Sequence, residues 1–360
     1  MTPLLPPSLR ARHHDPDHLS LQGKSPQACW LKSSCGGARS DPTAVSGVLP
    51  PPPPGPPAPP PPDYHNGVSM GGWLLTEPSW MFDGFSAPAE ADLVAMLRKQ
   101  GGDAFAVQTM RNHWEGYYPD AALDAMQAFG ITHARIPVGS WIVEPPAIPI
   151  PSPGDGTMYS YGFNHEGFVT GGMNALESAL AKLKARGIRA LVDLHALPGG
   201  SSQCQSYAGW QVEQPLFWQS SPPASNATPI SGCGGAGPYR TTRGAARTWM
   251  QVGEDALLAL AHWIVSLETR PELAGVVIGL EVVNEPGLGF SGVQPDIERL
   301  LTEIVPKLQG IFRDGGVAAN VTVNFIGPND VNTGPWLAQQ VASGLFNSSQ
   351  LLVDFHEYFK

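Results

Sequence analysis

The sequence predicts an α/β fold, a (β/α)8 barrel of which about six of the eight strands lie within these 360 residues. Two patterns favour this fold. From Gly67 onward, short apolar segments alternate with segments of helical periodicity, which is typical of repeated β-α units around a parallel sheet. The apolar segments lead into polar or aromatic residues, and a (β/α)8 barrel builds its site from side chains at the carboxyl ends of its strands. The length is sufficient, since such a barrel takes about 250 residues.

The predicted elements follow one another along the chain. Strands are predicted at residues 67–75, 132–139, 188–195, 275–286, 321–327 and 351–358. Helices are predicted at residues 120–130, 172–187, 248–270 and 296–316, with a helical-to-loop segment around 336–341. Gly130 and Gly187 mark two helix ends, because glycine readily takes the left-handed conformation that closes a helix. The residues at or near the six strand ends are Trp73, Arg135, His195, Glu285, Asn329 and His356.

Composition divides the chain into three parts. Residues 1–49 are polar with little periodicity and predict an N-terminal segment of low order. Residues 50–62 are almost all proline and predict an extended linker, because such a run has few amide donors for any other structure. Residues 63–360 form the predicted barrel.

Charge and hydropathy exclude two classes of partner. The formal net charge is −10 and 14% of the residues are charged, so there is no basic surface to neutralise the phosphates of a nucleic acid. No apolar run is long enough to span a bilayer, and the first residues lack the apolar core of a signal peptide. A neutral ligand fits this composition better.

Cysteines and glycosylation sequons favour an oxidising environment. Four cysteines fall into two local pairs, and three connectivities are open to them: Cys29, Cys35, Cys204 and Cys233. N-x-[ST] sequons occur at Asn226, Asn320 and Asn347. We therefore expect an extracellular or cell-wall protein, and read the missing signal peptide as an N-terminally incomplete chain.

The stretch GLEVVNEPGLGF, residues 279–290, supports two hypotheses. Gly287, Gly289 and Gly292 match the G-x-G-x-x-G pattern of a nucleotide cradle. A dinucleotide site, however, needs its strand to run directly into the first glycine and an acid at the end of the next strand, and neither condition is met. We expect these glycines to form a loop with room for a bulky ligand.

The second hypothesis makes Glu285 a catalytic acid. Glycoside hydrolysis needs a carboxylic acid beside the leaving oxygen and a second carboxylate, about 5–5.5 Å away where configuration is retained. Glu285 follows a buried strand, where it fits the first role, and Asn284 beside it could hold a sugar 2-hydroxyl.

Five segments together resemble a known family. In order and spacing, GVSMGGWLLTEP, HARIPVGSW, LVDLHALPGG, GLEVVNEP and VDFHEY are similar to the strand-end motifs of glycoside hydrolase family 5, and most similar to its exo-β-1,3-glucanase branch. The resemblance covers residues 64–360. It implies a TIM-barrel glycosidase.

The resemblance also implies roles for single residues. Glu285 would be the general acid/base, Asn284 would bind the 2-hydroxyl, and Arg135 would lower the pKa of the nucleophile by its opposite charge. The remaining implied roles are hydrogen bonds to substrate or catalytic carboxylates by His195 and His356, positioning of the nucleophile by Tyr358, and binding of nonreducing-end sugar hydroxyls by Glu77. For Trp141, a place in the core is favoured over a sugar-stacking platform.

The chain departs from the family in two places. The loop HALPGGSSQCQSYAGW differs from the family's usual one and leads into an insert, Cys204 to Cys233, which a disulfide could close. We expect this insert to cover the site or to be mobile. The family's nucleophile is a glutamate at the end of the seventh strand, beyond Lys360, so the chain is expected to be C-terminally incomplete. Glu357 cannot replace it, because it alternates with its neighbours and faces away from the site.

The sequence thus predicts a retaining β-glucan hydrolase, specifically a glucan 1,3-β-glucosidase of polysaccharide or cell-wall glucan breakdown. It needs no metal or organic cofactor, takes a β-glucan as its partner, and acts as a monomer. Two alternatives stay open: an endo-β-1,4-glucanase or mannanase of the same fold, and a non-catalytic carbohydrate-binding fragment.

Overall fold

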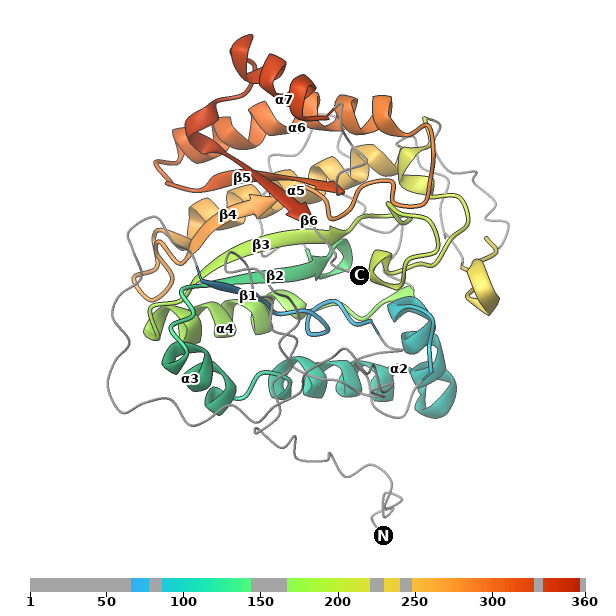
Figure 1. Cartoon of the computed structure of the whole chain (residues 1–360). Coiled ribbons are helices and arrows are strands. Elements are labelled where there is room, and N and C mark those ends of the chain that lie inside the picture. The colour runs from blue at the N-terminus through green and yellow to red at the C-terminus, as the bar shows by residue number, and fades with distance from the viewer. Residues whose placement is uncertain are drawn as a thin grey trace, which may run out of the picture.

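The computed structural model describes residues 66–77, 86–143, 167–220, 230–239, 248–326 and 333–356. Within them the chain forms one parallel sheet of six strands whose spatial order is their order in sequence. The strands are β1 Gly67–Ser69, β2 His133–Gly139, β3 Arg189–Ala196, β4 Val277–Glu281, β5 Asn320–Ile326 and β6 Leu351–His356. Figure 1 shows them side by side in a curled sheet. The predicted fold class, consecutive β-α units of a TIM barrel, is confirmed.

The register of the sheet brings acidic and amide residues to the same level on neighbouring strands. Asp193 on β3 is the register partner of Glu281 on β4. Asn324 on β5 is likewise the partner of Asp354 on β6. Partners in a parallel pair point to the same face, so these polar side chains gather on one side of the sheet.

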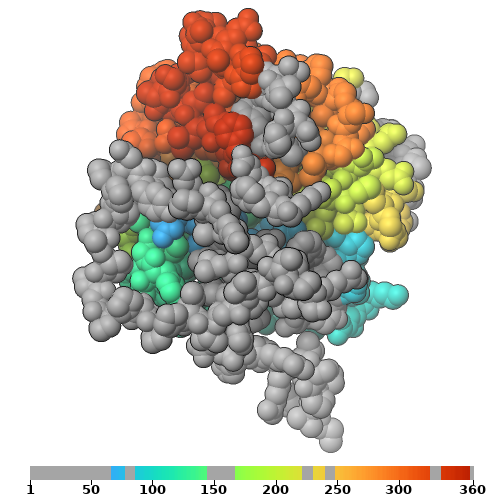
Figure 2. Space-filling model, viewed as in Figure 1, coloured from blue at the N-terminus to red at the C-terminus, as the bar shows by residue number. Residues whose placement is uncertain are grey.

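Helices cover the other side. They are α2 Glu90–Gly116, α3 Asp120–Ala128, α4 Gly172–Ala185, α5 Trp249–Leu267, α6 Gln294–Asp314 and α7 Thr333–Ala342. In Figure 1, α2 to α4 lie beside β1 to β3, whereas α5 to α7 lie beside β4 to β6. Figure 2 shows the same division on the surface, with the C-terminal elements in orange and red above the earlier ones. None of the described helices combines the length and apolar character needed to cross a membrane.

The longest helix, α2, is missing from the sequence-based prediction. It has 27 residues, but Gly101 and Gly102 interrupt its pattern, and Gly102 leaves the helical region with φ 81° and ψ −178°. The helical periodicity is reset at this kink, so neither half reads as a long amphipathic helix.

Two predicted strands are too long. Residues 70–75 and 282–283 are apolar and buried as a strand would be, yet β1 ends at Ser69 and β4 at Glu281. The prediction was wrong there because these residues are apolar and buried although they lie beyond the ends of the strands. The chain turns after β1, where Gly72 has φ 72°.

The predicted insert after β3 is closed by a disulfide between Cys204 and Cys233. Its described parts fold into the short 3-10 turns η5 Ser206–Ala208, η6 Leu216–Trp218 and η7 Cys233–Gly235. Trp210 stacks on Tyr239 with 5.1 Å between ring centroids, and Trp210 is almost fully buried. Trp210 also meets Trp249 of α5 edge-on, so these residues extend the hydrophobic core of the barrel.

Several predictions fall outside the described residues. These are the N-terminal segment 1–49 with Cys29 and Cys35, the linker 50–62, Asn226, Asn329 and Tyr358.

Candidate active site

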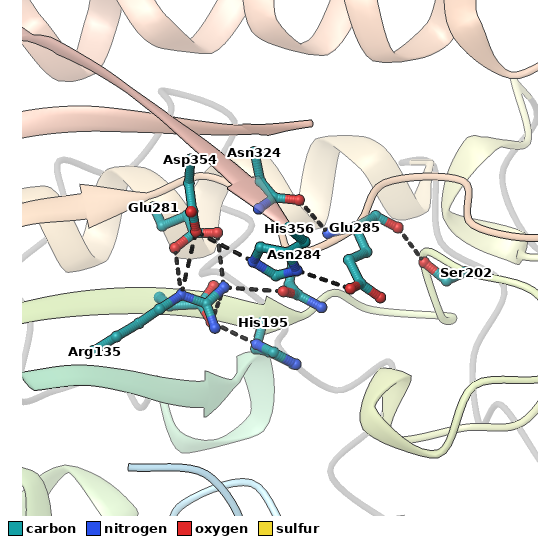
Figure 3. Close-up of polar contacts among 10 residues, drawn as sticks. Arg135, His195, Ser202, Glu281, Asn284, Glu285, Asn324, Asp354 and His356 are labelled. Atoms are coloured by element: carbon teal, nitrogen blue, oxygen red, sulfur yellow. Dashed lines mark hydrogen bonds and ion pairs between the residues drawn. The ribbon is translucent and has the colours of Figure 1, made fainter. Parts of the chain in front are cut away.

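Arg135 lies at the centre of a buried cluster of charged and polar side chains from four strands (Figure 3). Its Nε and Nη2 donate to the two carboxylate oxygens of Glu281, each at 2.8 Å. Nη2 also donates to Asn284 Oδ1 at 2.9 Å and lies 2.9 Å from Asp193 Oδ2. Asp354 completes the cluster at 3.7 Å from Nε. Arg135 is the third residue of β2, not its end, which places the guanidinium deep in the sheet.

The cluster sets three carboxyl groups against one guanidinium. Burial alone would lower the pKa of Arg135, but Asp193 and Glu281 raise it, so the guanidinium stays charged. Burial raises the pKa of Glu281 to about 8, while Arg135 opposes this shift and Asp193 adds to it. For Asp354, burial would raise the pKa, but His356 and Arg135 bring it below its ordinary value. Three carboxyl groups thus share one buried cation, and Glu281 binds it through both oxygens.

His195, the last polar residue of β3, is held on two sides. Its Nδ1 is bonded to Asp193 Oδ2, two residues earlier on the same strand face. The ring of Tyr207 meets the imidazole edge-on, with 5.2 Å between centroids. These two contacts fix the orientation of the imidazole ring.

Glu285 follows β4 by four residues and is 3% exposed. Its backbone has φ 41°, in the left-handed region that residues other than glycine seldom adopt. Its N–H donates to Asn324 Oδ1 at 2.9 Å, and its carbonyl accepts from Ser202 Oγ at 2.7 Å. Its carboxylate Oε1 lies 2.8 Å from His356 Nδ1. Figure 3 shows the carboxylate pointing away from Arg135 and toward His356.

His356 lies between two carboxylates. Besides Glu285, it contacts Asp354 through Nε2 at 3.2 Å. Burial alone would lower the pKa of His356, but the hydrogen bonds to Asp354 and Glu285 raise it to about 9. At neutral pH the ring is therefore an imidazolium that donates to both acids. The imidazolium thus donates a hydrogen bond to Oε1 of Glu285.

One trio of these residues has the composition of a metal site. Ligand atoms of Glu281, Asp354 and His356 lie within 4.8 Å of one another. Arg135, however, already binds both oxygens of Glu281 and pairs with Asp354, and His356 carries a proton on the nitrogen that faces Asp354. These residues fit a guanidinium, not a metal ion.

Glu77 lies on the loop that follows β1 and is half-buried. Its Oε2 accepts a hydrogen bond from Ser206 Oγ at 3.3 Å, which links this loop to the disulfide-closed insert.

Another buried acid, Glu90, holds the loop that carries Glu77 through hydrogen bonds to Thr76. It is fully buried, and its Oε2 accepts from the N–H of Thr76 at 2.7 Å and from Thr76 Oγ1 at 3.1 Å. Its Oε1 accepts from Trp141 Nε1 at 2.9 Å. Burial raises the pKa of Glu90 to about 7, although these three hydrogen bonds act to lower it. Trp141 also stacks on Phe168, so it is a core residue as the sequence favoured.

The glycines after Glu285 form a folded loop. Gly287, Gly289 and Gly292 all have positive φ, and a side chain at Gly287 would meet Val293. The N–H of Gly287 donates to Ser201 O at 3.0 Å, so it is not available to a phosphate. This geometry supports the rejection of a nucleotide cradle.

The structure brings most predicted site residues together. Side chains from β2, β3, β6 and the loop after β4 meet in one cluster, namely Arg135, His195, His356, Asn284 and Glu285. Glu77 lies on a neighbouring loop. Nothing is described for Tyr358.

Sequence reasoning missed the acids that support these residues. Asp193 and Asp354 each precede a site histidine by two positions, a spacing that puts both side chains on one face of a strand. That i, i+2 repeat was visible in LVDLH and VDFH. Glu281, Ser202 and Asn324 carry no comparable local signal, because their partners lie far away in sequence.

Comparison with known proteins finds several that are similar to this chain in sequence. No family model matches the chain. The chain is 24% identical over 298 residues to the protein named "Probable glucan 1,3-beta-glucosidase A" of Aspergillus clavatus, covering 81% of this chain and 55% of that protein. It is 33% identical over 159 residues to the protein of the same name from Aspergillus niger, covering 42% and 32%. A "Glucan 1,3-beta-glucosidase" of Schwanniomyces occidentalis matches at 27% over 152 residues, covering 39% and 32%. The chain is a relative of these glucan 1,3-beta-glucosidases.

The sequence match covers only part of the relatives, and solved structures show a similar fold. The chain spans about half the length of the Aspergillus clavatus relative that it matches over most of its own residues. Among solved structures, the rutinosidase of Aspergillus niger superposes with a TM-score of 0.51 at 17% identity, covering 82% of this chain and 69% of that one. The structure of AoRut gives 0.53 at 16% identity with the same coverage. These likenesses support the barrel fold.

Proposed function

We propose that the protein is a retaining β-glucan hydrolase, specifically a glucan 1,3-β-glucosidase, in which Glu285 is the general acid/base. The observation that carries this proposal is the contact of the Glu285 carboxylate with cationic His356, directly after β4 and beside Asn284. The relatives named glucan 1,3-beta-glucosidase supply the substrate class. The substrate is a β-1,3-glucan.

In the first step, the Glu285 carboxyl group, protonated on the oxygen that does not face His356, gives that proton to the glycosidic oxygen as the bond from that oxygen to the anomeric carbon breaks. A second carboxylate attacks the anomeric carbon and forms a glycosyl ester. In the second step, Glu285 takes a proton from water, whose oxygen displaces the ester and regenerates both carboxyl groups. Configuration at the anomeric carbon is inverted twice and so retained.

His356 stabilises Glu285 when Glu285 is ionised. After proton transfer Glu285 is an anion in a buried site, where an unpaired charge is unfavourable. The imidazolium 2.8 Å away donates a hydrogen bond to that anion. Asp354 keeps the imidazole protonated from its other side.

The nucleophile is not one of the acids around Arg135. Glu281 has both oxygens bound by the guanidinium, and Asp193 is bound by Arg135 and His195. The resemblance to the exo-β-1,3-glucanases puts the nucleophile on the strand that would follow β6. Asp354 is the member of the cluster that lies on β6.

The test uses protein made from the natural transcript, read through the codon after Lys360. Hydrolysis of laminarin is followed by the release of reducing sugar, and the anomer formed first is identified by proton NMR. Wild type should release the β-anomer. Glu285→Gln should reduce kcat by at least about 10³-fold, and Glu272→Gln on the surface should leave it unchanged.

Three outcomes would overturn the proposal. Undiminished hydrolysis by Glu285→Gln would remove its acid/base role. Binding of laminari-oligosaccharides without hydrolysis would favour the carbohydrate-binding alternative, and turnover of cellulose or mannan in place of laminarin would favour the endo-acting one. A stop codon directly after Lys360 in an intact message would leave the mechanism without its nucleophile.

The same proposal places the protein outside the cell or in the cell wall, where β-glucan is found, and has it act there as a monomer. The disulfide between Cys204 and Cys233 supports this location, because such bonds persist in oxidising compartments.

A further inference from the structure

The backbone of Glu285 is fixed by the side chains of Asn324 and Ser202, of which Asn324 also interacts with Asp354. Glu285 has φ 41°, and a residue with a Cβ keeps such a conformation only when its surroundings enforce it. Asn324 Oδ1 accepts the Glu285 N–H, and Ser202 Oγ donates to the Glu285 carbonyl. The three residues are at most 3% exposed, so water does not compete for these hydrogen bonds.

We propose that Ser202 and Asn324 are positioning residues that clamp the Glu285 peptide and thereby direct its carboxylate onto His356. They come from the loop after β3 and from β5, on either side of the β4 loop in the sheet order. Asn324 accepts from the N–H of Glu285, and Ser202 donates to its carbonyl. Rotation of Glu285 toward an ordinary extended or helical φ would break both hydrogen bonds.

The Ser202 side of this clamp is itself anchored. Ser201 O accepts from the N–H of Gly287 at 3.0 Å and from Trp218 Nε1 at 2.7 Å. Gln203 N–H donates to Leu288 O at 2.8 Å. The next residue, Cys204, carries the disulfide. The loop that holds Glu285 is thus tied into the insert, which is a structural use for the disulfide.

The direction of a side chain depends on φ, because rotation about N–Cα swings Cβ around the backbone. Glu285 reaches His356 across 71 residues of sequence at 2.8 Å. A displaced Cβ would withdraw the carboxylate from His356. Asp354 would then remain as the ring's partner, and the pKa of His356 would fall.

The chain offers a matched control for this idea. Ser201 adjoins Ser202 and is equally buried, but within the described residues its Oγ has no hydrogen-bond partner. Ser201→Ala removes the same atom from the same segment and leaves the clamp intact. Ser202→Thr keeps a hydroxyl at the clamp.

The test measures the pKa of His356 by NMR, with its imidazole resonance assigned by its loss in His356→Asn. Glu285→Gln sets the full effect of losing the carboxylate, a fall of about one to two pKa units, since a hydrogen bond to a charged group contributes about 1.5–3 kcal/mol. Ser202→Ala should lower the pKa by a substantial part of that fall, whereas Asn324→Ala also changes the surroundings of Asp354 and so does not isolate the clamp. Ser201→Ala and Ser202→Thr should leave it at the wild-type value. A wild-type pKa in Ser202→Ala would overturn the proposal.

The catalytic consequence rests on the proposed function and is measured separately. On laminarin, Ser202→Ala should lower kcat about tenfold with KM unchanged, since the substrate contacts stay in place. If wild type does not hydrolyse glucan while the His356 pKa shifts as expected, the clamp stands and the proposed function fails. If wild type hydrolyses glucan and Ser202→Ala matches Ser201→Ala in kcat, the clamp has no catalytic role.

Discussion

The imidazole of His356, on β6, donates from Nδ1 to Oε1 of Glu285, which follows β4, across 2.8 Å. This contact joins elements that are not neighbours in the sheet, since β5 lies between their strands. Both residues are largely buried, and Asp354 supports the imidazole from behind. The protonation state of His356 thus sets the net charge around Glu285.

His356 should make the protein less stable as the pH rises from about 6.5 to 9. Its pKa is raised from 6.5 in the unfolded chain to about 9 when folded, so the folded state binds the extra proton and its stabilisation is lost through that window. The shift corresponds to about 3 kcal/mol of unfolding free energy. Urea unfolding at pH 6, 7.5 and 9 should show this loss in wild type and a flatter dependence in His356→Gln.

His262 provides the control for that experiment. Burial lowers its pKa, so the unfolded chain binds this proton more tightly than the folded one, and His262 causes no loss of stability as the pH rises. His262→Gln should therefore retain at least the wild-type loss between pH 6 and 9. An equally steep profile in His356→Gln would show that other groups cause the loss.

Replacement of Arg135 should be among the most destabilising changes in the chain. Arg135→Met leaves Asp193 and Glu281 buried without their cation, and removing one partner of a buried ion pair costs about 3–5 kcal/mol. Arg135→Lys should recover only part of this, because an ammonium cannot bind both oxygens of Glu281 at once. Denaturant midpoints give the measurement.

A surface ion pair calibrates this effect. Arg299 pairs with Asp296 on α6 at 3.1 Å with both side chains partly exposed, so Arg299→Met should change the unfolding free energy by less than about 1 kcal/mol. Equal losses in Arg135→Met and Arg299→Met would contradict the idea that the buried cluster holds the strands together.

Glu90 should make stability fall between about pH 4.5 and 7. Burial raises its pKa from 4.5 to about 7, so the folded state favours the neutral acid, and its stabilisation is fully present below 4.5 and lost by 7. Glu90→Gln cannot ionise, so it should remove about 3 kcal/mol of that pH dependence. Thermal unfolding at pH 4.5, 5.5 and 7 checks this. The exposed Glu272→Gln should retain the wild-type slope, and a wild-type slope in Glu90→Gln would refute the assignment.

Loss of the disulfide should destabilise the insert and the loop that it anchors. Cys204 and Cys233 are 29 residues apart, and closing a loop of that size contributes about 3–4 kcal/mol in the chain-entropy account. The double variant Cys204→Ser/Cys233→Ser should unfold at lower denaturant. Dithiothreitol should lower the wild-type midpoint to that of the variant and leave the variant unchanged; a wild-type midpoint insensitive to reduction would contradict the prediction.

Sequence alone predicted the parts of this protein that depend on local pattern. The apolar segments of β2, β3, β5 and β6 and the periodic segments of α4, α5 and α6 lie close to their predicted bounds. The strand-end residues came together because a parallel sheet aligns its carboxyl ends. The sequence did not predict α2, because Gly101 and Gly102 interrupt its helical periodicity.

The rest of the site depends on contacts that no local pattern records. Arg135 meets Glu281 across 146 residues, and Ser202 meets Glu285 across 83. An isolated serine or acid reads as a solvated surface group until the fold buries it. The positive φ of Glu285 is likewise a product of its neighbours, since glutamate has no intrinsic preference for it.

The strictly sequential order of the sheet has a consequence for synthesis on the ribosome. Each strand from β2 to β6 pairs with the strand made just before it, so every new strand finds its docking edge already in place. The charge on Arg135 is compensated in the same order, first by Asp193, then by Glu281, and last by Asp354. Translation thus builds the sheet and neutralises its central cation from one end to the other.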